Sequence, residues 1–223
     1  MKNLTLIIPA KREKESLPFV LDEIKNLDCN VSIVLDEKDH ETISSIKDYK
    51  HKIIFQKGKG YGDALITGIK NTDTELFCIF NADGSFDPKE LSGMIEKLNS
   101  ENLDFLFASR YQSNSGSEDD NLITLVGNYI FTMLGKIFFR LKLTDILYTF
   151  VIGKTSSMKE LDLNRKDFSF CVEFPIKAKR LNKKMASIGA YERPRIGGIK
   201  KVNAFKDGFL ILMYMIIIFF RKD

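Results

Sequence analysis

Histidine and cysteine are scarce in this chain of 223 residues. The two histidines, His40 and His51, lie in polar stretches, where we see no basis for a catalytic Ser-His-Asp or Cys-His arrangement. The three cysteines, Cys29, Cys78 and Cys171, are far apart and form no Cys-x-x-Cys pair. We therefore expect reduced, structural thiols in a cytosolic protein.

The chain also lacks an uninterrupted apolar run long enough to cross a bilayer, which takes about 20 residues. The run at Leu4–Ile8 is too short for a signal peptide and predicts a first strand instead. The longest run, Phe209–Phe220, has twelve apolar residues, and as a helix it covers about 18 Å of a hydrocarbon core of about 30 Å. We expect residues 208–223 to form an apolar, membrane-associated helix, and a helix packed in the protein core is the alternative.

A second apolar segment, Leu122–Leu143, contains no acidic residue. Polar residues interrupt it at every fourth position, too often for a membrane span, and on a helix they form one polar stripe on an apolar cylinder. These residues are Thr124, Asn128, Thr132, Lys136 and Arg140. We expect this helix to lie in the membrane interface with its cationic residues toward the headgroups, and packing in the protein core is the alternative.

Charges nearly balance over the whole chain, with a formal net charge of +4, but they are unevenly distributed. Residues 176–206 contain ten Lys or Arg and a single acid, Glu192. A basic segment of this kind suits a partner that carries phosphate, such as a nucleotide, an anionic lipid or a nucleic acid. The alternative is a solvated basic face.

Strand and helix patterns alternate through the first ~110 residues, which predicts an α/β protein with a largely parallel sheet. The expected strands are 4–8, 31–35, 52–55, 76–80 and 103–108, and the expected helices are 16–27, 41–49, 61–70 and 88–99. Three polar strand ends, Pro9–Glu13, Asp36–Glu37 and Asn81–Asp83, should then share the edge where open α/β sheets bind ligands. The polar stretch Gln112–Asn121 predicts a mobile loop, which could act as a lid.

Two motifs in this half could carry chemistry. The oxygen atoms of Asn81-Ala82-Asp83 suit a hard divalent cation that takes further oxygens from a diphosphate, and an ordinary acidic turn is the alternative. The run Gly58-Lys59-Gly60-Tyr61-Gly62 precedes a helix, where close backbone approach and the helix N-terminus favour a phosphate. The third glycine of a dinucleotide-binding fingerprint would fall at Asp63, so the run does not match that fingerprint. A plain glycine-rich turn without a phosphate is an equal alternative.

The order of these and further motifs along the chain is more specific than any one of them. The motifs are Ile8-Pro9-Ala10 with Glu13, Asp36-Glu37, Lys57-Gly58-Lys59-Gly60, Asn81-Ala82-Asp83 with Asp87-Pro88, Ala108-Ser109-Arg110-Tyr111, Gly127-Asn128 with Asp145, and Arg195 with Gly198 and Lys201. Over about residues 3–207 the chain resembles the family 2 glycosyltransferases, especially the polyprenyl-phosphate sugar transferases. Asn81 stands where this family usually has the first acid of its Asp-x-Asp metal motif.

The resemblance implies a three-layer α/β/α sandwich of the GT-A type, the fold of nucleotide-diphospho-sugar transferases. It implies a catalytic domain at 1–207, with a nucleotide-binding half at about 1–110 and an acceptor half at about 111–207. The implied activity is that of an inverting hexosyltransferase, which moves a sugar from a UDP- or GDP-sugar to a polyprenyl phosphate. We expect the protein on the cytoplasmic face of the membrane, without a nucleic-acid partner.

The resemblance also assigns roles to individual residues. The donor would be bound by Pro9, Ala10, Glu13, Asp36, Glu37, Lys59, Gly60, Asn81 and Asp83. A Mg²⁺ or Mn²⁺ ion would be bound by Asp83, Asn81 and Ser85. The acceptor would be bound by Arg110, Arg195 and Lys201. Asp83 is then central to catalysis, and Asp145 or Glu173 would act as base if the acceptor were a sugar hydroxyl. A nucleotidyltransferase and a non-catalytic membrane-surface binding protein are the competing interpretations.

Overall fold

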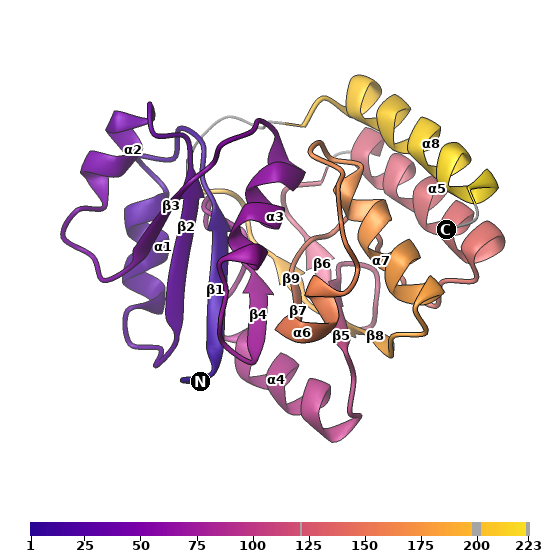
Figure 1. The fold of residues 1–223 in the computed structure, drawn as a ribbon, viewed down its shortest axis with the longest axis horizontal. Coiled ribbons are helices and arrows are strands. Elements are labelled where there is room, and N and C mark those ends of the chain that lie inside the picture. The colour runs from indigo at the N-terminus through magenta and orange to yellow at the C-terminus, as the bar shows by residue number, and fades with distance from the viewer. Residues whose placement is uncertain (121, 198–201, 222–223) are drawn as a thin grey trace.

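The computed structural model describes residues 1–120, 122–197 and 202–221, which form a layered α/β structure (Figure 1). Its central sheet has seven strands in the order β3-β2-β1-β4-β7-β5-β8. These are β1 (Leu4–Pro9), β2 (Asn30–Leu35), β3 (Lys52–Phe55), β4 (Leu76–Ile79), β5 (Phe105–Ser109), β7 (Val151–Lys154) and β8 (Met185–Gly189). The sheet is parallel except for β7, which is antiparallel to both neighbours. A separate ribbon pairs β6 (Gly116–Ser117) with β9 (Tyr191–Glu192).

Helices cover both faces of this sheet. On one face α1 (Leu17–Ile24) and α4 (Glu90–Ser100) pack in a core that includes Leu6 and Ile8 of β1. On the other face α3 (Tyr61–Lys70) and α7 (Phe170–Arg180) pack in a core that includes Ile7. Alternate residues of β1 therefore enter two different cores, as expected for a parallel strand buried on both faces. The expected three-layer α/β/α sandwich with a mostly parallel sheet is confirmed. Two short helices, α2 (His40–Ser45) and α6 (Thr155–Lys159), complete the layers.

Helix α1 begins after Ser16, as the sequence predicts, but Ser16 does not cap it with its side chain. Its hydroxyl instead donates a hydrogen bond to the carboxylate of Glu13 (2.8 Å). The helix ends at Ile24, three residues before the expected end at Leu27. The bond between Ser16 and Glu13 fixes the loop between β1 and α1, which borders the polar strand ends.

Helix α5 (Leu122–Phe139) turns part of its polar stripe inward. Asn128 and Thr132 are buried, whereas the apolar side chains of Tyr129 and Ile137 are 66% and 62% exposed. This is the reverse of a helix in a water-soluble protein, whose apolar stripe faces the core. The helix ends earlier than expected because Arg140 takes a left-handed conformation with a φ of 53°.

Helix α8 (Ala204–Phe220) lies beside α5 at the upper right of Figure 1. It begins four residues before the expected 208, because the side chain of Asn203 accepts a hydrogen bond from the backbone of Lys206 (3.0 Å) and caps the helix. Its buried residues, Ile211, Tyr214, Met215 and Ile218, form a third core with residues of α5 and α7. The remaining apolar residues of α8 are largely exposed, so the α5 and α8 pair presents a broad apolar surface.

By length and composition, α5 is the one helix in the described part of the chain that could cross a membrane. Only 17% of its residues are buried against the rest of the protein. This finding differs from the sequence-based expectation that its polar residues interrupt it too often for a span. The difference arises because the mean hydropathy over the 18 residues is high despite the spaced polar residues, which the sequence-based expectation treated as interruptions.

Candidate active site

Three polar strand ends meet at the carboxyl edge of the sheet. Strand β1 lies between β2 and β4, and all three run parallel. Their carboxyl ends place Pro9–Glu13, Asp36–Glu37 and Asn81–Asp83 along one edge, as the sequence predicts. An open α/β sheet binds ligands at this edge, so it is the candidate site.

Asp83 occupies a tight turn just after β4. Its Oδ1 accepts hydrogen bonds from the backbone N–H (3.1 Å) and the hydroxyl (2.7 Å) of Ser85. The amide nitrogen of Asn81 donates to the same hydroxyl oxygen (3.1 Å). Gly84, between Asp83 and Ser85, has a φ of 82°, a left-handed conformation that glycine adopts without strain. The turn thus gathers Asn81, Asp83 and Ser85 into one cluster, which we call the Asp83 turn.

The segment 193–196 runs along the Asp83 turn and brings a cation to it. Ile196 donates its backbone N–H to the carbonyl of Asp83 (2.9 Å). This places Nη2 of Arg195 3.5 Å from Oδ2 of Asp83. The same guanidinium makes two 3.0 Å hydrogen bonds with the carboxylate of Asp119, and these bonds raise the pKa of Arg195 above its ordinary value. Arg195 therefore links the Asp83 turn, as a permanent cation, to the acidic residues 118–120, which we call the acidic loop.

A divalent cation at the Asp83 turn would have a single carboxylate to bind. Because Ser85 engages Oδ1, the oxygen that remains for a cation is Oδ2, which faces the guanidinium of Arg195. Within residues 1–120, 122–197 and 202–221, no group of three or more His, Cys, Asp and Glu side chains could hold a metal. A cation here would take its other oxygens from a substrate's phosphates and from water, as Mg²⁺ usually does.

The stretch predicted as a mobile loop is held down in this structure. Its β6 strand pairs with β9, and Glu118 accepts a hydrogen bond from the hydroxyl of Tyr191 (2.7 Å). Asp119 pairs with Arg195, and Asp120 accepts a 2.6 Å hydrogen bond from Tyr111. The acidic loop is therefore fixed next to Arg195 by contacts of all three of its carboxylates.

Arg110, just after β5, lies in a buried network of carboxylates and is 9% exposed. Its Nε and Nη2 bond the two oxygens of Asp145 (2.8 and 3.2 Å), and Nη1 bonds Asp120 (3.2 Å) and Glu192 (3.1 Å). Burial alone would lower the pKa of Arg110, but Asp145 and the other carboxylates raise it well above its ordinary value. Because protein carboxylates engage these nitrogens, an acceptor phosphate would have to displace one of them to reach Arg110.

Two members of this network, Asp120 and Glu192, were not among the residues predicted from the sequence. Burial raises the pKa of Glu192 above its ordinary value, and the nearby charge of Arg110 opposes that rise. A signal for Glu192 was present, because it is the single acid in the basic segment 176–206. An isolated acid among ten cations indicates a carboxylate with a specific partner.

Asp145 connects this network to helix α5. Its Oδ1 accepts hydrogen bonds from the side-chain amide of Asn128 (3.0 Å) and from the backbone N–H of Tyr148 (3.2 Å). The same amide nitrogen of Asn128 also bonds the hydroxyl of Tyr111 (3.1 Å). The buried polar side of α5 is therefore part of the Arg110 network, while its opposite side is exposed and apolar.

Glu173, the other carboxylate considered as a base, lies in the first turn of α7 and is fully buried. Its oxygens accept hydrogen bonds from the backbone N–H groups of Asn164 (3.1 Å) and Arg165 (2.8 Å), and Lys177 lies 3.1 Å away. None of these partners belongs to the Asp83 turn. The carboxylate ties the preceding loop to the helix.

The predicted base and ribose contacts lie at the other strand ends. Glu13 is buried and accepts the hydrogen bond from Ser16, while its backbone N–H donates to Thr42 (3.0 Å). Asp36 is exposed and accepts a hydrogen bond from the backbone of Lys38 (3.0 Å), and Glu37 is exposed as well. Glu13 is thus held rigidly, and the two acids after β2 face solvent.

The glycine-rich turn packs against neighbouring protein groups. The N–H of Gly58 donates to the carboxylate of Asp63 (3.1 Å). A Cβ at Gly60 would lie 2.2 Å from the carbonyl oxygen of Lys166, which explains why this position needs glycine. Lys59 is exposed. Because Asp63 already takes the N–H of Gly58, the turn is partly closed to a phosphate.

Lys201, the remaining predicted acceptor contact, lies outside the described residues.

A model of the family described as Glycosyl transferase family 2 matches residues 5–162 of the chain. The chain is similar to an uncharacterized glycosyltransferase of Mycobacterium tuberculosis strain H37Rv, with 22% identity over 208 residues that cover 93% of each chain. It is also similar to a UDP-N-acetylglucosamine–dolichyl-phosphate N-acetylglucosaminyltransferase of Methanococcus voltae. There the identity is 25% over 207 residues, which cover 80% of this chain and 81% of the relative.

The structure is similar to crystal structures of glucosyl-3-phosphoglycerate synthase from Mycobacterium tuberculosis. The complex with phosphoglyceric acid gives a TM-score of 0.76 at 10% identity, and the match covers 100% of this chain and 81% of that chain. The complex with Mn²⁺, UDP and glucosyl-3-phosphoglycerate gives a TM-score of 0.74 at 12% identity, covering 96% and 80%. At these identities the likeness concerns the fold.

Proposed function

Because the chain belongs to glycosyl transferase family 2 and has the GT-A fold, we propose that this glycosyltransferase moves a sugar from a nucleotide-diphosphate donor to a polyprenyl phosphate, with inversion at the anomeric carbon. The reaction takes place at the cytoplasmic face of a membrane, where the protein is peripherally bound. The single observation that carries the acceptor assignment is the two-sided character of helix α5.

One side of α5 joins the Arg110 network, which contacts Asp120 beside the Asp119 partner of Arg195, and the other side is apolar and exposed. Asn128 holds Asp145 from the buried side, while Tyr129 and Ile130, the next residues along the helix, are 66% and 49% exposed. A monomeric soluble protein rarely exposes an apolar surface as large as that of α5 and α8. Helices with such a surface lie in the boundary between headgroups and acyl chains. A lipid acceptor in the same boundary would have its phosphate beside the site.

The donor lies along the carboxyl edge of β1, β2 and β4. Pro9, Ala10, Glu13 and the Asp36-Glu37 pair face its base and ribose, and Lys59 and Gly60 border the nucleotide from the end of β3. Asn81, Asp83 and Ser85 would hold a divalent cation, Mg²⁺ or Mn²⁺, that serves the donor's diphosphate. When bound, this cation stabilises the negative charge that develops on the leaving nucleotide diphosphate.

The transfer step needs no base when the acceptor is a phosphate. An oxygen of the lipid phosphate, already an anion, forms the new bond to the anomeric carbon. The bond from that carbon to the donor's diphosphate oxygen breaks, and its electron pair leaves with the nucleotide diphosphate. Arg195, 3.5 Å from Asp83, and Lys201 hold the acceptor phosphate by charge-assisted hydrogen bonds. Asp119 must release Arg195 for this to occur.

The network around Arg110 bears on the alternative acceptor. A sugar hydroxyl would need a carboxylate to take its proton, and Asp145 and Glu173 are the candidates. Asp145 is fully buried and paired with Arg110 through two hydrogen bonds, and Glu173 is held by backbone N–H groups. Both carboxylates already accept hydrogen bonds from protein groups, so an acceptor hydroxyl would compete with these partners to reach either of them. We therefore assign Arg110 to positioning Asp145 and the loop at Asp120.

The names of two similar proteins support the same assignments. The Methanococcus voltae relative is named for transfer from UDP-N-acetylglucosamine to dolichyl phosphate, which is a nucleotide-sugar donor and a lipid-phosphate acceptor. The Mycobacterium tuberculosis synthase was crystallised with Mn²⁺ and UDP. A divalent cation and a nucleotide-sugar donor are thus the expectation for the present chain.

The test has two stages. Calorimetry with UDP- and GDP-sugars, with and without Mn²⁺, identifies the donor and shows whether binding depends on the metal. Release of nucleotide diphosphate is then measured with three acceptors: a short-chain polyprenyl phosphate, a sugar, and 3-phosphoglycerate. We expect metal-dependent binding of one donor and turnover with the lipid phosphate.

Each other outcome overturns a defined part of the proposal. Turnover with the sugar or with 3-phosphoglycerate, and not with the lipid, would reject the acceptor. Release of pyrophosphate from a nucleoside triphosphate would identify a nucleotidyltransferase. A protein that binds membranes but no nucleotide would be the non-catalytic binding protein.

A further inference from the structure

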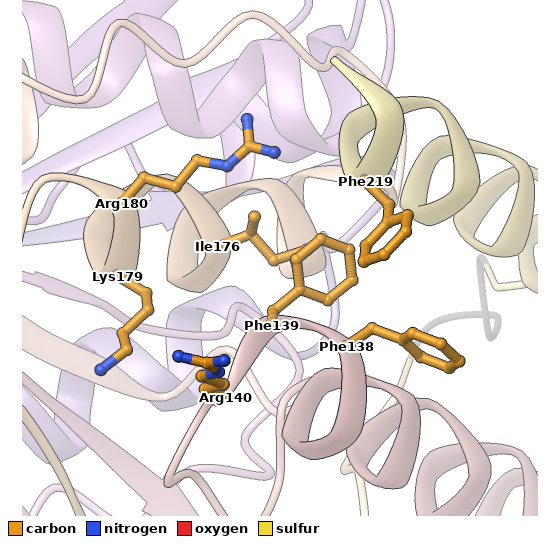
Figure 2. A pocket seen from close by; sticks show the side chains of 7 residues that line it. All are labelled: Phe138, Phe139, Arg140, Ile176, Lys179, Arg180 and Phe219. Carbon is orange, nitrogen blue, oxygen red and sulfur yellow. The ribbon is translucent and has the colours of Figure 1, made fainter. Parts of the chain in front are cut away.

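A pocket of about 240 Å³ lies where the carboxyl ends of α5, α7 and α8 come together (Figure 2). It has a cationic side and an aromatic side, and Figure 2 shows the cationic side chains on α7 and at the end of α5, and the rings on α5 and α8. The cations are Arg140, Lys179 and Arg180, and the rings are those of Phe138, Phe139 and Phe219. We call this the C-end pocket.

Local structure explains why these residues meet. The left-handed conformation of Arg140 stops α5, so that its side chain extends beyond the last turn. The rings of Phe138 and Phe139 pack against Phe219 of α8, with centroids 5.6 and 5.9 Å apart. Arg180 hydrogen-bonds the carbonyl of Ile218, which joins α7 to the end of α8. The pocket is therefore fixed by contacts among three helices.

The C-end pocket is net positive. Each helix carboxyl end contributes a partial charge of roughly −0.5, so three such ends give about −1.5. Arg180 is engaged with the carboxyl end of α8, and the other two cations, Arg140 and Lys179, exceed the charge of about −1 at the ends of α5 and α7. No acidic side chain lines the pocket among the residues that the structure describes. Cations that merely balanced the helix dipoles would leave no excess charge. The pocket is thus suited to an anion that carries an apolar tail, because the phenylalanines border the cations.

We propose that the C-end pocket binds the phosphate headgroup of an anionic phospholipid in the bilayer that covers α5 and α8. The proposal rests on the membrane location given above for the enzyme. It concerns a second lipid site, distinct from that of the acceptor. From Asn128, which holds Asp145, to the end of α5 at Phe139 the helix rises by about 17 Å, and this rise separates the C-end pocket from the network at Asp145. The lipid would anchor and orient the enzyme without taking part in the transfer.

The test compares two doubly substituted full-length proteins. The variant Arg140→Gln with Lys179→Gln removes two cations from the C-end pocket. The control variant Lys47→Gln with Lys50→Gln removes two exposed cations near α2, at the opposite end of the molecule in Figure 1. Flotation is measured with vesicles of phosphatidylcholine alone and of phosphatidylcholine mixed with phosphatidylglycerol. A cation near an anionic membrane contributes roughly a fivefold gain in affinity, so the pocket variant should lose roughly 30-fold on the anionic vesicles.

The control variant should bind both kinds of vesicle as the unmodified protein does, and turnover of a short-chain lipid phosphate in detergent should be the same in all three proteins. Equal binding of the unmodified protein to both vesicles would overturn the headgroup site and leave the membrane location standing. An equal loss in the control would show a general charge effect and also overturn it. Failure to bind either vesicle would reject both the site and the membrane location.

Discussion

Replacing Arg110 by methionine should destabilise the fold more than any change of an exposed charge. The substitution keeps the apolar stem and removes the cation that Asp145, Asp120 and Glu192 share. Asp145 is 0% exposed and Glu192 is 9% exposed at the side chain, so water cannot replace the lost partner. Removing one member of a buried ion pair costs about 3–5 kcal/mol in the free energy of unfolding, and we expect that range at neutral pH.

The loss of stability in Arg110→Met should also depend on pH. Burial raises the pKa of Glu192 in the folded protein, and Arg110 opposes the rise, so the pKa should climb further in the variant. Between the unfolded and folded pKa values the folded state binds more protons, and stability falls as pH increases. The destabilisation should therefore be larger near pH 7 than near pH 5.

Urea unfolding followed by circular dichroism, at both pH values, measures these losses. Lys14→Met is the control, because Lys14 pairs with Glu41 at the surface with side chains 50% and 75% exposed. Such a pair contributes about 0–1 kcal/mol. A loss for Arg110→Met no greater than that of the control, or a loss independent of pH, would refute the account of this network.

Three further predictions concern packing, Glu173 and the membrane surface. Gly68→Ala should lower the free energy of unfolding by about 1–3 kcal/mol, because the new Cβ would lie 2.4 Å from Ile7. The control Gly93→Ala, whose Cβ would have nothing within 4 Å, should raise the melting temperature. Stability changes of the same sign in both variants would contradict this. Glu173→Gln should cost about 1–3 kcal/mol of unfolding free energy with kcat unchanged, and a fall in kcat would restore Glu173 as a base. Ile137→Ser should weaken vesicle binding about tenfold and leave urea unfolding unaltered; unchanged flotation would remove α5 from the membrane contact.

The first half of the fold could be predicted from the sequence because its strands and helices alternate and each carries a local pattern. Strand β3 and helix α3 fall on the expected residues. The antiparallel strand β7 could not be predicted in this way, since it inserts between β4 and β5 from a distant part of the chain. Its place depends on long-range pairing, which no local pattern encodes.

The residues of the candidate site also fall into those that a local pattern predicts and those that depend on long-range contacts. Asn81, Asp83 and Ser85 lie within five residues of one another, so a single turn brings them together. The approach of Arg195 to Asp83 depends instead on the path of a segment more than a hundred residues away. The inward rotation of Asn128 likewise depends on Asp145, a partner that helical spacing does not reveal.

The most direct test of the central claim is the turnover of Asp83→Asn, measured with the donor found by calorimetry, Mn²⁺ and a lipid phosphate. The matched control is Asp87→Asn, four residues along, whose carboxylate accepts a hydrogen bond from the backbone of Lys89 (2.9 Å). If Asp83 holds the cation on the diphosphate, its loss removes several kcal/mol of charge stabilisation, and kcat should fall by about 100-fold or more. The circular dichroism spectrum and the turnover of the control should match the unmodified protein. Turnover by Asp83→Asn equal to that of the unmodified enzyme would contradict the account.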